Sequence, residues 1–433
     1  MSLSKIRPNH SLSNPYIDPN FDLDVPHAEW KRPHQLVSKP LFTINGCSKF
    51  DINQGQLGDC WFLAAVQSLA KYDHIINHVL NIEVNTFDHN AYCGAFIFTF
   101  WRYGEYRKVL IDDRLPTRNG HLIYLNCVYD ENDRDKAEFW PCLLEKAYAK
   151  LKGGYNNIEG GFASEAFTDM IGSMGTYVKI KDLGFSNTSL FDYINDHIQS
   201  GGFISCSTQK NNEGIVPGHA YSITKTAMLD SHALIRVRNP WGNFEAVNTK
   251  WADRSDKWDW YENFAEQHDF KNDNDGEFWL DISEFVNFFE NLTISLPKKQ
   301  GLAICTSSNA GKFWTDLVET DFKLEKGTSY RDKKFLPRIQ FDLHERSKCM
   351  VSTMLKQHRR KDKDDIFIGF QVFKIEGNRR IKVHTVDFYR NLYEHMNEIQ
   401  LERGKYEIQI GSIRALETSH LGFCRVWVQV GAI

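Results

Sequence analysis

The sequence has no apolar run close to the ~20 residues that a membrane-spanning helix needs, so no transmembrane segment is predicted. Its first ten residues are polar and lack the hydrophobic core of a signal peptide, which predicts a cytoplasmic protein. The nine cysteines are odd in number, scattered, and include no Cys-x-x-Cys pair. In a reducing compartment we expect them to be free thiols rather than a disulfide framework.

The remaining composition, 42% hydrophobic and 25% charged, is that of an ordinary globular protein. A length of 433 residues exceeds what one hydrophobic core usually serves and predicts two or three domains. The net charge of −4 is unevenly spread, because residues 300–433 carry a net +6 and the rest a net −10. An acidic front part suits a cation ligand and a basic rear part suits an anionic surface, although solvated faces explain both equally well. No nucleic-acid partner is expected.

The pattern of predicted elements changes along the chain and divides it into four segments. Residues 1–40 are rich in Pro, Asn and His without periodicity, and predict an extended or poorly ordered N-terminal extension. Residues 41–200 predict a helical lobe and residues 201–297 a strand-rich lobe, with Gly201–Gly202 as the candidate hinge. Residues 300–433 predict an antiparallel β-sandwich. The predicted fold class is therefore α+β, with a two-lobed core followed by an all-β domain.

Hydrophobic periodicity and turn signals locate the individual elements. Helices are expected at residues 60–70, 138–151 and 189–199. Strands are expected at residues 95–101 and 106–111, which form a hairpin, and at 203–206, 220–224 and 233–238. The strands expected in the sandwich cover residues 338–343, 366–375, 406–410 and 423–430.

The segment Gln54–Trp61 carries the strongest chemical signal in the sequence. It reads Gln-Gly-Gln-Leu-Gly-Asp-Cys-Trp and runs without a breaker into residues 62–70, so Cys60 is predicted at the N-terminus of a helix. Partial positive charge there stabilises a thiolate, the nucleophilic form of cysteine. Gln54 offers an amide that suits a developing oxyanion. The alternative is a buried cysteine that serves only as a small hydrophobe.

Two later segments offer partners for Cys60. His219 begins one predicted strand, and Asn239 ends the next, where Pro240 stops strand pairing. Neighbouring antiparallel strands bring the two side chains together. Taken alone, His219 also fits a core histidine, Asn239 a turn initiator, and the nearby Trp241 a core tryptophan.

The order of a cysteine, a distant histidine and an asparagine is that of papain-like proteases. In that chemistry His219 forms an imidazolium beside the Cys60 thiolate and then protonates the leaving amine. Asn239 orients the ring without adding charge, and Trp241 is placed to shield their hydrogen bond from water.

Four strings together resemble the calpain family of cysteine proteases. They are Gln-Gly-x-x-Gly-Asp-Cys-Trp at 54–61, Gly-His-Ala-Tyr-Ser at 218–222, Arg-Asn-Pro-Trp-Gly at 238–242 and Asp-Gly-Glu-Phe-Trp at 275–279. The resemblance covers residues 40–296 strongly and residues 300–433 more weakly, where it implies a C2-like sandwich. It implies a protein substrate, a Cys60–His219–Asn239 triad, and an oxyanion hole formed by Gln54 and the Cys60 N–H.

The resemblance also implies two calcium ions in the protease core, one per lobe, that draw the lobes together. The first site would use the carbonyls of Ile44 and Gly46 and the carboxylates of Asp51 and Glu138. The second would use Glu245, Asp253, the carbonyl of Asp273, Asp275 and Glu277. Hard oxygen ligands suit calcium, although residues 273–276 alone fit a polar turn equally well. The segment is not an EF-hand loop, because Lys271 and Ile282 occupy its first and last ligand positions.

The sequence departs from the family pattern at two places in the core. Ala246–Asn248 stands where the family has Trp-Thr-Gly, in the loop that would carry the second calcium site. Lys49 stands where the family has an arginine, so a bidentate link to Glu277 between the lobes becomes a single contact.

The rear of the sequence bears on possible partners. The cluster His358–Lys361, followed by the acidic run Asp362–Asp365, fits a solvated loop or a calcium-assisted contact with anionic membrane. The sandwich lacks the glycine-cysteine signature usual in the family. No calmodulin-like EF-hand domain follows it, so we expect a monomer without the small regulatory subunit.

The leading hypothesis is a calcium-activated cysteine endopeptidase that makes limited cuts in other proteins. A non-proteolytic relative that binds lipid or acts as a scaffold is the first alternative. Transglutaminase-like acyl transfer is another, but that family has an aspartate in place of Asn239.

Overall fold

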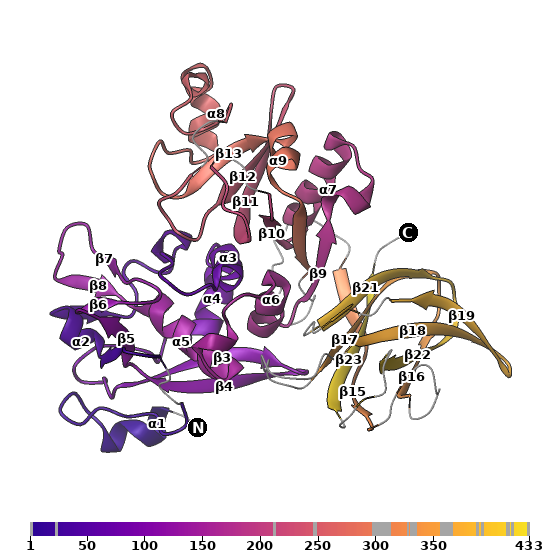
Figure 1. The fold of residues 1–433 in the computed structure, drawn as a ribbon, viewed down its shortest axis with the longest axis horizontal. Helices are drawn as coiled ribbons and strands as arrows, with labels where there is room; N and C mark the ends of the chain where they lie inside the picture. The colour runs from indigo at the N-terminus through magenta and orange to yellow at the C-terminus, as the bar shows by residue number, and fades with distance from the viewer. Residues whose placement is uncertain are drawn as a thin grey trace. The chain divides into compact units, whose positions relative to one another are not determined.

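The computed structural model of the chain describes residues 3–21, 25–210, 214–245, 249–296, 313–326, 329, 336–355, 367–386, 389–390, 394–412, 416 and 420–430. The chain forms two compact units (Figure 1). Unit 1 comprises residues 1–101, 106–171 and 177–295, and unit 2 comprises residues 102–105, 172–176 and 296–433. Unit 1 mixes helices with antiparallel sheets, and the described C-terminal part of unit 2 is all-β. The predicted α+β class is therefore confirmed.

The predicted helices are present in unit 1, with ends that differ from the prediction by at most two residues. The described helices are α1 (Leu3–Ile6), α2 (Pro33–Leu36), α3 (Cys60–Leu69), α4 (Asp73–Leu80), α5 (Trp140–Lys152), α6 (Ala163–Ile171), α7 (Asn187–Gln199), α8 (Glu262–Gln267) and α9 (Ile282–Phe288). The three predicted helices correspond to α3, α5 and α7.

Helices α3 and α5 form the centre of the helical part of unit 1, which we define as residues 41–101 and 106–171. Every residue of α3 after the first is buried, as expected for a helix that is apolar on all sides. α5 ends at Gly153, whose φ of 89° is the left-handed conformation that glycine adopts without strain. The rings of Phe62 and Tyr148 stack with centroids 4.2 Å apart and join the two helices.

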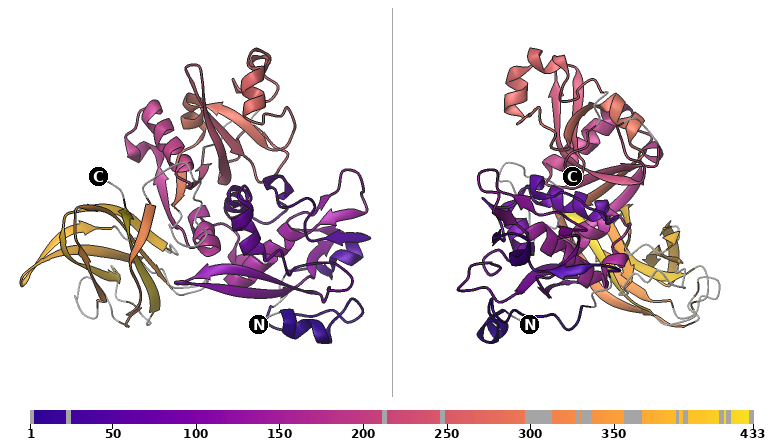
Figure 2. Two further views of the ribbon diagram at one scale, coloured as in Figure 1. Left: turned by 180° about the vertical axis from the view of Figure 1, so that it is seen from behind. Right: turned by 60° about the vertical axis from the view of Figure 1, so that its left-hand side comes forward.

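The sheet part of unit 1, which we define as residues 177–295, is coloured from magenta to orange in Figure 2. It is built on a six-stranded sheet of order β13-β12-β11-β10-β14-β9. Its strands are β9 (Met174–Lys179), β10 (Phe203–Thr208), β11 (His219–Leu229), β12 (His232–Arg238), β13 (Glu277–Asp281) and β14 (Asn291–Leu296). In the antiparallel pair β11–β12, Ser222 lies opposite Arg238. This register brings the start of β11 beside the end of β12, as predicted.

The predicted lobe boundary after residue 200 is too late in the sequence. β9 is an edge strand of the six-stranded sheet, and Leu190 and Phe191 of α7 pack in the core of that sheet. The sheet part therefore begins before Gly201–Gly202, which lies inside it rather than between the parts. A Cβ added to Gly202 would lie 2.8 Å from the carbonyl oxygen of His197, so close packing explains this glycine.

Smaller sheets complete unit 1. They contain β1 (Glu29–Lys31) with β5 (Leu115–Arg118) and β6 (His121–Leu122), and β2 (Lys39–Leu41) with β8 (Lys136–Glu138) and β7 (Val128–Tyr129). β3 (Ala95–Arg102) and β4 (Glu105–Asp112) form the predicted hairpin.

The prediction of an extended or poorly ordered segment over residues 1–40 is wrong for the residues that the structure describes. Leu3 and Ile6 of α1 are buried in a cluster with Ala95 and Leu110 of the hairpin. The short helices and strands here escaped detection because each is only three or four residues long and has no visible periodicity.

The described strands of unit 2 form two antiparallel sheets around a shared hydrophobic core. One sheet contains β15 (Phe313–Leu324), β23 (His420–Val430), β17 (Ser347–Leu355) and β21 (Glu394–Leu401). The other contains β16 (Arg338–Leu343), β22 (Gly404–Ser412), β18 (Phe367–Glu376), β19 (Arg379–Thr385) and β20 (Tyr389–Arg390). The buried Arg425 donates to the carbonyl oxygens of Gly172 and Ser173 at 2.7 and 2.6 Å, which fastens residues 172–176 within this unit.

Several predictions of the sequence concern residues that the structure does not describe. The departure at Ala246–Asn248, the basic cluster His358–Lys361 and the acidic run Asp362–Asp365 lie outside the described residues. None of the described helices is long and apolar enough to cross a membrane.

Candidate active site

Cys60 is the first residue of α3, where the sequence predicts it. Asp59 is the N-cap of the helix, and its side chain does not accept a hydrogen bond from the helix backbone. The Cys60 thiol is hydrogen bonded to the backbone of Ala220 on β11. Burial raises the pKa of this thiol to about 11, although the bond from Ala220 acts to lower it. The thiol is therefore neutral at pH 7 in this structure.

His219 and Asn239 meet at the neighbouring ends of β11 and β12. His219 Nε2 lies 2.8 Å from Asn239 Oδ1, and that oxygen also accepts from the Trp241 N–H at 3.0 Å. Asn239 Nδ2 donates to Phe244 O at 3.1 Å, which fixes the orientation of the amide. Because Oδ1 only accepts, His219 Nε2 carries the hydrogen and Nδ1 is the basic nitrogen.

The surroundings of His219 favour the neutral imidazole. Burial lowers the pKa of His219 to about 4, against the bond to Asn239, which raises it. The ring centroid of Trp241 lies 5.0 Å from that of His219, so the indole covers one side of the imidazole. Since Ala220, the partner of the Cys60 thiol, follows His219 directly, the fold brings the thiol and the imidazole to the same end of β11.

Gln54 is tied to both parts of unit 1. Its backbone N–H donates to Pro240 O at 3.1 Å, beside Asn239. Its side-chain amide Nε2 donates to Leu57 O at 2.7 Å and to Asp59 Oδ1 at 3.2 Å. Both amide hydrogens thus point at acceptors within the loop. A hydrogen bond from Gln54 to an oxyanion would require one of these two bonds to be exchanged.

Sequence reasoning missed two buried carboxyl groups directly behind this loop. Asp59 and Glu145 of α5 are 0% and 2% exposed, and their side chains are hydrogen bonded to each other. Burial raises the pKa of both, that of Asp59 to about 7. A charged residue in the middle of a helix that is otherwise buried is the sequence signal that points to Glu145.

The first predicted calcium site contains a second carboxyl pair. Asp51 and Glu138 are hydrogen bonded to each other, and burial followed by the charge of Asp51 raises the pKa of Glu138 to about 9. Glu138 Oε2 also accepts from the Ile44 N–H at 2.7 Å. Gly46 lies in the same loop with a left-handed φ of 97°. Two facing carboxyl groups with backbone carbonyls close by in the chain fit a hard divalent cation.

In the second predicted calcium site, several acidic side chains lie close enough for their charges to act on one another. Burial, followed by the charges of Glu245 and Asp275, raises the pKa of Asp253 to about 8. Asp253 Oδ2 is buried without a hydrogen-bond partner in the described part of the chain. Glu245 and Asp275 accept from the backbone N–H groups of Gly276 and Glu277, both at 2.8 Å. This repulsive, oxygen-rich set also fits calcium.

Neither set is complete as it stands. Among the described residues, no three Asp, Glu, His or Cys side chains converge closely enough to hold a metal ion. The carbonyl oxygen of Asp273 accepts from the Asp275 N–H at 2.9 Å. Glu277 is engaged elsewhere: burial opposes its ionisation, but Lys49 and Arg236 lower its pKa below the ordinary value.

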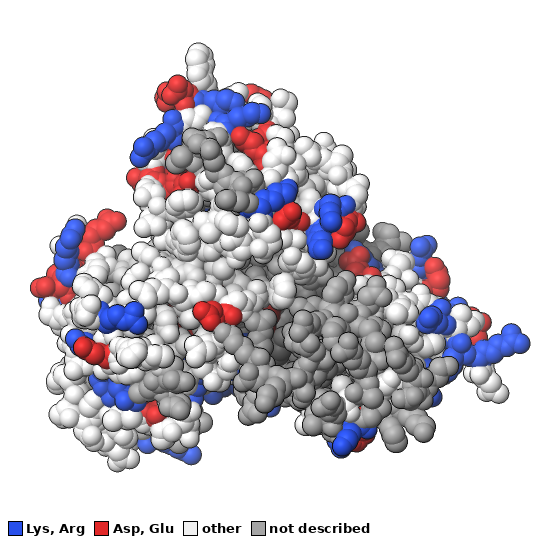
Figure 3. All heavy atoms as spheres, viewed as in Figure 1, with Lys and Arg blue, Asp and Glu red and all other residues white. Residues whose placement is uncertain are grey.

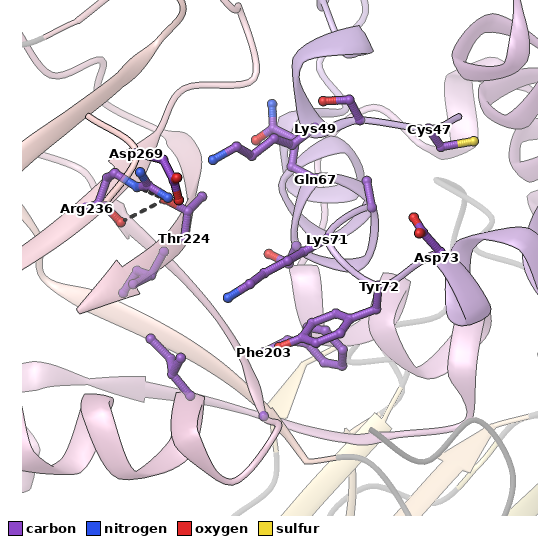
Figure 4. Close-up of a pocket in the computed structure, with 16 residues that line it drawn as sticks. Cys47, Lys49, Gln67, Lys71, Tyr72, Asp73, Phe203, Thr224, Arg236 and Asp269 are labelled. Atoms are coloured by element: carbon purple, nitrogen blue, oxygen red, sulfur yellow. Dashed lines mark hydrogen bonds between the residues drawn. The ribbon is translucent and has the colours of Figure 1, made fainter. Parts of the chain in front are cut away.

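A cavity of about 380 Å³ lies where the helical and sheet parts meet, near the C-terminal end of α3 (Figure 4). Figure 4 shows the ammonium groups of Lys49 and Lys71 pointing from the helical part towards Thr224 and Arg236. Lys49 Nζ lies 2.5 Å from Glu277 Oε1, and Arg236 Nε lies 3.6 Å from the same oxygen. Lys49 therefore makes one contact with Glu277, as its replacement of an arginine predicts.

The neutral state of the thiol leads to the first prediction. In calcium-free protein, iodoacetamide should alkylate Cys60 slowly at neutral pH and faster as the pH rises towards the raised pKa of the thiol. Mass spectrometry of the Cys60 peptide measures the rate, with Cys127, whose pKa burial also raises, as the internal reference. A fast rate that is constant between about pH 5 and 8 would instead indicate a preformed thiolate–imidazolium pair.

Comparison with known proteins bears directly on this site. Residues 11–296 match the family model described as "Calpain family cysteine protease". The chain is 38% identical over 384 residues to Calpain-A of Drosophila melanogaster, covering 81% of this chain and 45% of that protein. It is 31% identical over 426 residues to the Calpain-2 catalytic subunit of Homo sapiens, covering 87% and 58%. The chain spans about half the length of the curated relatives that it matches.

Likeness to solved structures adds nothing to this comparison. An exo-beta-1,3-galactanase from Phanerochaete chrysosporium has a TM-score of 0.18 at 10% identity, covering 48% of this chain and 44% of that chain. A score this low carries no argument. The family match instead covers every residue proposed for the catalytic site, from Gln54 to Asn239. The chain belongs to the calpain family of cysteine proteases.

Proposed function

We propose that this protein is a calcium-activated cysteine endopeptidase with a Cys60–His219–Asn239 triad. The observation that carries the proposal is the Asn239-oriented His219 at the start of β11, next to the residue that bonds the Cys60 thiol. The helical and sheet parts of unit 1 would then be the two lobes of a papain-like core, and unit 2 a C2-like sandwich. The substrates would be other proteins, cut at a limited number of sites.

The proposed reaction follows from the tautomer of His219. Nδ1 accepts the proton of the Cys60 thiol, and the thiolate attacks the scissile carbonyl carbon to form a C–S bond. The oxyanion so formed would accept from the Cys60 N–H and from Gln54. His219 Nδ1 then gives its proton to the leaving amine, and water releases the acyl group by the reverse sequence. Asn239 keeps the imidazole in the required orientation throughout.

The electrostatics of the core support a requirement for a cation. With a pKa of about 11 for Cys60 and about 4 for His219, proton transfer between them is unfavourable in this structure. Carboxyl groups with raised pKa values occur in both parts, at Glu138 and at Asp253. Bound calcium would supply positive charge at each of these sets. The rearrangement of those loops would then reset the surroundings of the thiol and the imidazole.

Contact with a membrane, cytoplasmic localisation and a monomeric state stay predictions. On the face of unit 2 that Figure 3 shows, the described basic and acidic side chains lie side by side. The basic residues that motivated membrane binding lie outside the described residues. A non-proteolytic role as a lipid-binding or scaffolding protein is the alternative. Covalent labelling of Cys60 by an epoxide inhibitor in calcium separates the two functions.

Cleavage of an unstructured protein should require both Cys60 and calcium. We expect the wild type to cut in calcium and to be inactive in chelator, and Cys60→Ser to be inactive in both, because a hydroxyl is a far weaker nucleophile than a thiolate. Gel electrophoresis of the substrate over a calcium titration measures this. Equal cleavage by the two proteins would remove Cys60 from the mechanism, and full activity in chelator would remove calcium.

Gln54→Ala should lower kcat by roughly 10²–10³, with a smaller effect on KM, because its amide would stabilise only the charge of the transition state. Steady-state kinetics in saturating calcium measure both constants. Gln56→Ala, a change in the same loop, is the control and should leave kcat near the wild-type value. An unchanged kcat in Gln54→Ala would exclude the side chain from the oxyanion hole.

Glu138→Gln and Asp253→Asn should each weaken calcium binding by roughly tenfold or more, because each removes a charged oxygen ligand. Calorimetry in the inactive Cys60→Ser background measures the affinity without self-cleavage. Asp133→Asn is the matched control, since Asp133 is a surface carboxylate paired with Lys39 at 2.9 Å. Calcium affinity that changes equally in all three variants would contradict the proposed ligand sets.

A further inference from the structure

Asp59 and Glu145 form a buried carboxyl pair with no basic partner among the described residues. Asp59 Oδ2 and Glu145 Oε1 receive no hydrogen bond from any N–H or hydroxyl group in the described part of the chain. The basic residue next to Glu145, Lys146, is bonded to Asp112 and to Arg114 O instead, both at 2.5 Å. Since no described N–H or hydroxyl group donates to these oxygens, the hydrogen bond between the two side chains uses a proton that the pair itself carries.

No basic side chain among the described residues supplies the pair with a compensating charge. The ionisable side chains that act on it, or on which it acts, are Cys60, Tyr124, Cys142 and Tyr155, and each of these is neutral or acidic. Two adjacent carboxylates in such a site would repel each other and lose their hydration, so one proton stays between them at neutral pH. The negative charge is better placed on Asp59, which accepts from Gln54 Nε2 at 3.2 Å and lies at the positive N-terminal end of α3, so the proton lies on Glu145.

The pair is connected to the reacting groups through Asp59. Asp59 Oδ1 accepts from Gln54 Nε2 at 3.2 Å, while Glu145 Oε2 accepts from the Leu125 N–H at 3.4 Å. The carbonyl oxygen of Asp59 accepts from the first turn of α3, from the Phe62 and Leu63 N–H groups at 2.9 and 3.1 Å. One residue thus holds both the Gln54 amide and the start of the helix that carries Cys60.

We propose that Asp59 and Glu145 are positioning residues for the cleavage reaction, and that their shared proton holds Asp59 as the acceptor that places the Gln54 amide beside Cys60. This inference rests on the proposed protease function, and it adds a buried proton to the machinery of the oxyanion hole. Glu145 does not touch the substrate and acts only through Asp59. Loss of its proton donor would leave Asp59 Oδ2 buried without a hydrogen bond, so that the carboxylate turns away and releases Gln54.

A double-mutant cycle tests this connection. Glu145→Leu is expected to lower kcat by roughly 10- to 100-fold with little change in KM, because a displacement near 1 Å of a catalytic group costs about that much. In a Gln54→Ala background the same change should have almost no effect on kcat, since the group that it positions is already absent. Equal losses in the two backgrounds would overturn the proposal.

Two further variants separate positioning from a loss of fold. Glu145→Gln keeps a hydrogen-bond donor towards Asp59 and should retain kcat within about threefold of the wild type. Glu165→Gln is the matched control: it alters another buried carboxylate of unit 1, bonded to Lys152 at 2.6 Å, and its effect on kcat should be the same in both Gln54 backgrounds. A Glu145→Gln protein as impaired as Glu145→Leu would also overturn the proposal.

The shared proton can be measured without any activity. Infrared difference spectra of wild type against Glu145→Gln at neutral pH should contain the carbonyl band of a neutral, buried carboxylic acid. Its absence would show that the pair holds no proton and would overturn the proposal. A wild-type protein with this band but no protease activity would instead contradict the proposed function and leave the proton-sharing pair in place.

Discussion

The packing of α3 against β11 is the contact on which the candidate site depends, because the proposed nucleophile and the proposed base come from different parts of unit 1. α3 contributes Cys60 at its N-terminus, and β11 contributes His219 at its own start. The interface contains the bond of the Cys60 thiol to Ala220. About two turns further along α3, Ser222 Oγ donates to Gln67 Oε1 at 3.0 Å. Any shift of the two parts would separate the thiol from the imidazole, so the proposed reaction would depend on how closely the parts approach.

The protonation states of Cys60 and His219 explain why packing of the two parts would not by itself give a reactive thiolate. Cys60 and His219 are both buried, and burial favours their neutral forms, against the ion pair that the proposed nucleophilic attack needs. Elsewhere in unit 1, burial and mutual repulsion raise the pKa values of carboxyl groups such as Glu138 and Asp253. Ionisation of these acidic groups is opposed by lost hydration and by repulsion between them, and a positive charge bound beside them would offset both effects. Lys49 of the helical part already supplies a positive charge to one acidic residue of the sheet part, Glu277.

Much of the arrangement could be predicted from the sequence, because the signals were strong and local. The unbroken apolar run after Cys60 predicts α3, and the strand patterns on either side of a turn predict that His219 and Asn239 lie together. The N-terminal segment could not be predicted, since elements of three or four residues have no periodicity and are stabilised by burial against the β3–β4 hairpin. The extent of the sheet part was misjudged because Gly201–Gly202 suggested a hinge, whereas pairing of β9 with distant β14 has no local signal.

The Asp59–Glu145 pair illustrates a conflict that only the structure reveals. An acidic N-cap normally stabilises its helix through the positive end of the helix dipole. Next to a nucleophilic cysteine the same negative charge raises the pKa of the thiol and opposes the thiolate, as the charge of Asp59 does here. A proton donated by Glu145 draws that charge away from the thiol without removing the acceptor that Gln54 needs. Asn at position 59 could accept from Gln54 only by turning its NH2 group towards Glu145, which would then be the ionised and buried carboxylate. A carboxylate at position 59 accepts hydrogen bonds from both Gln54 and Glu145, and the bond from Glu145 limits how far its charge raises the pKa of the Cys60 thiol.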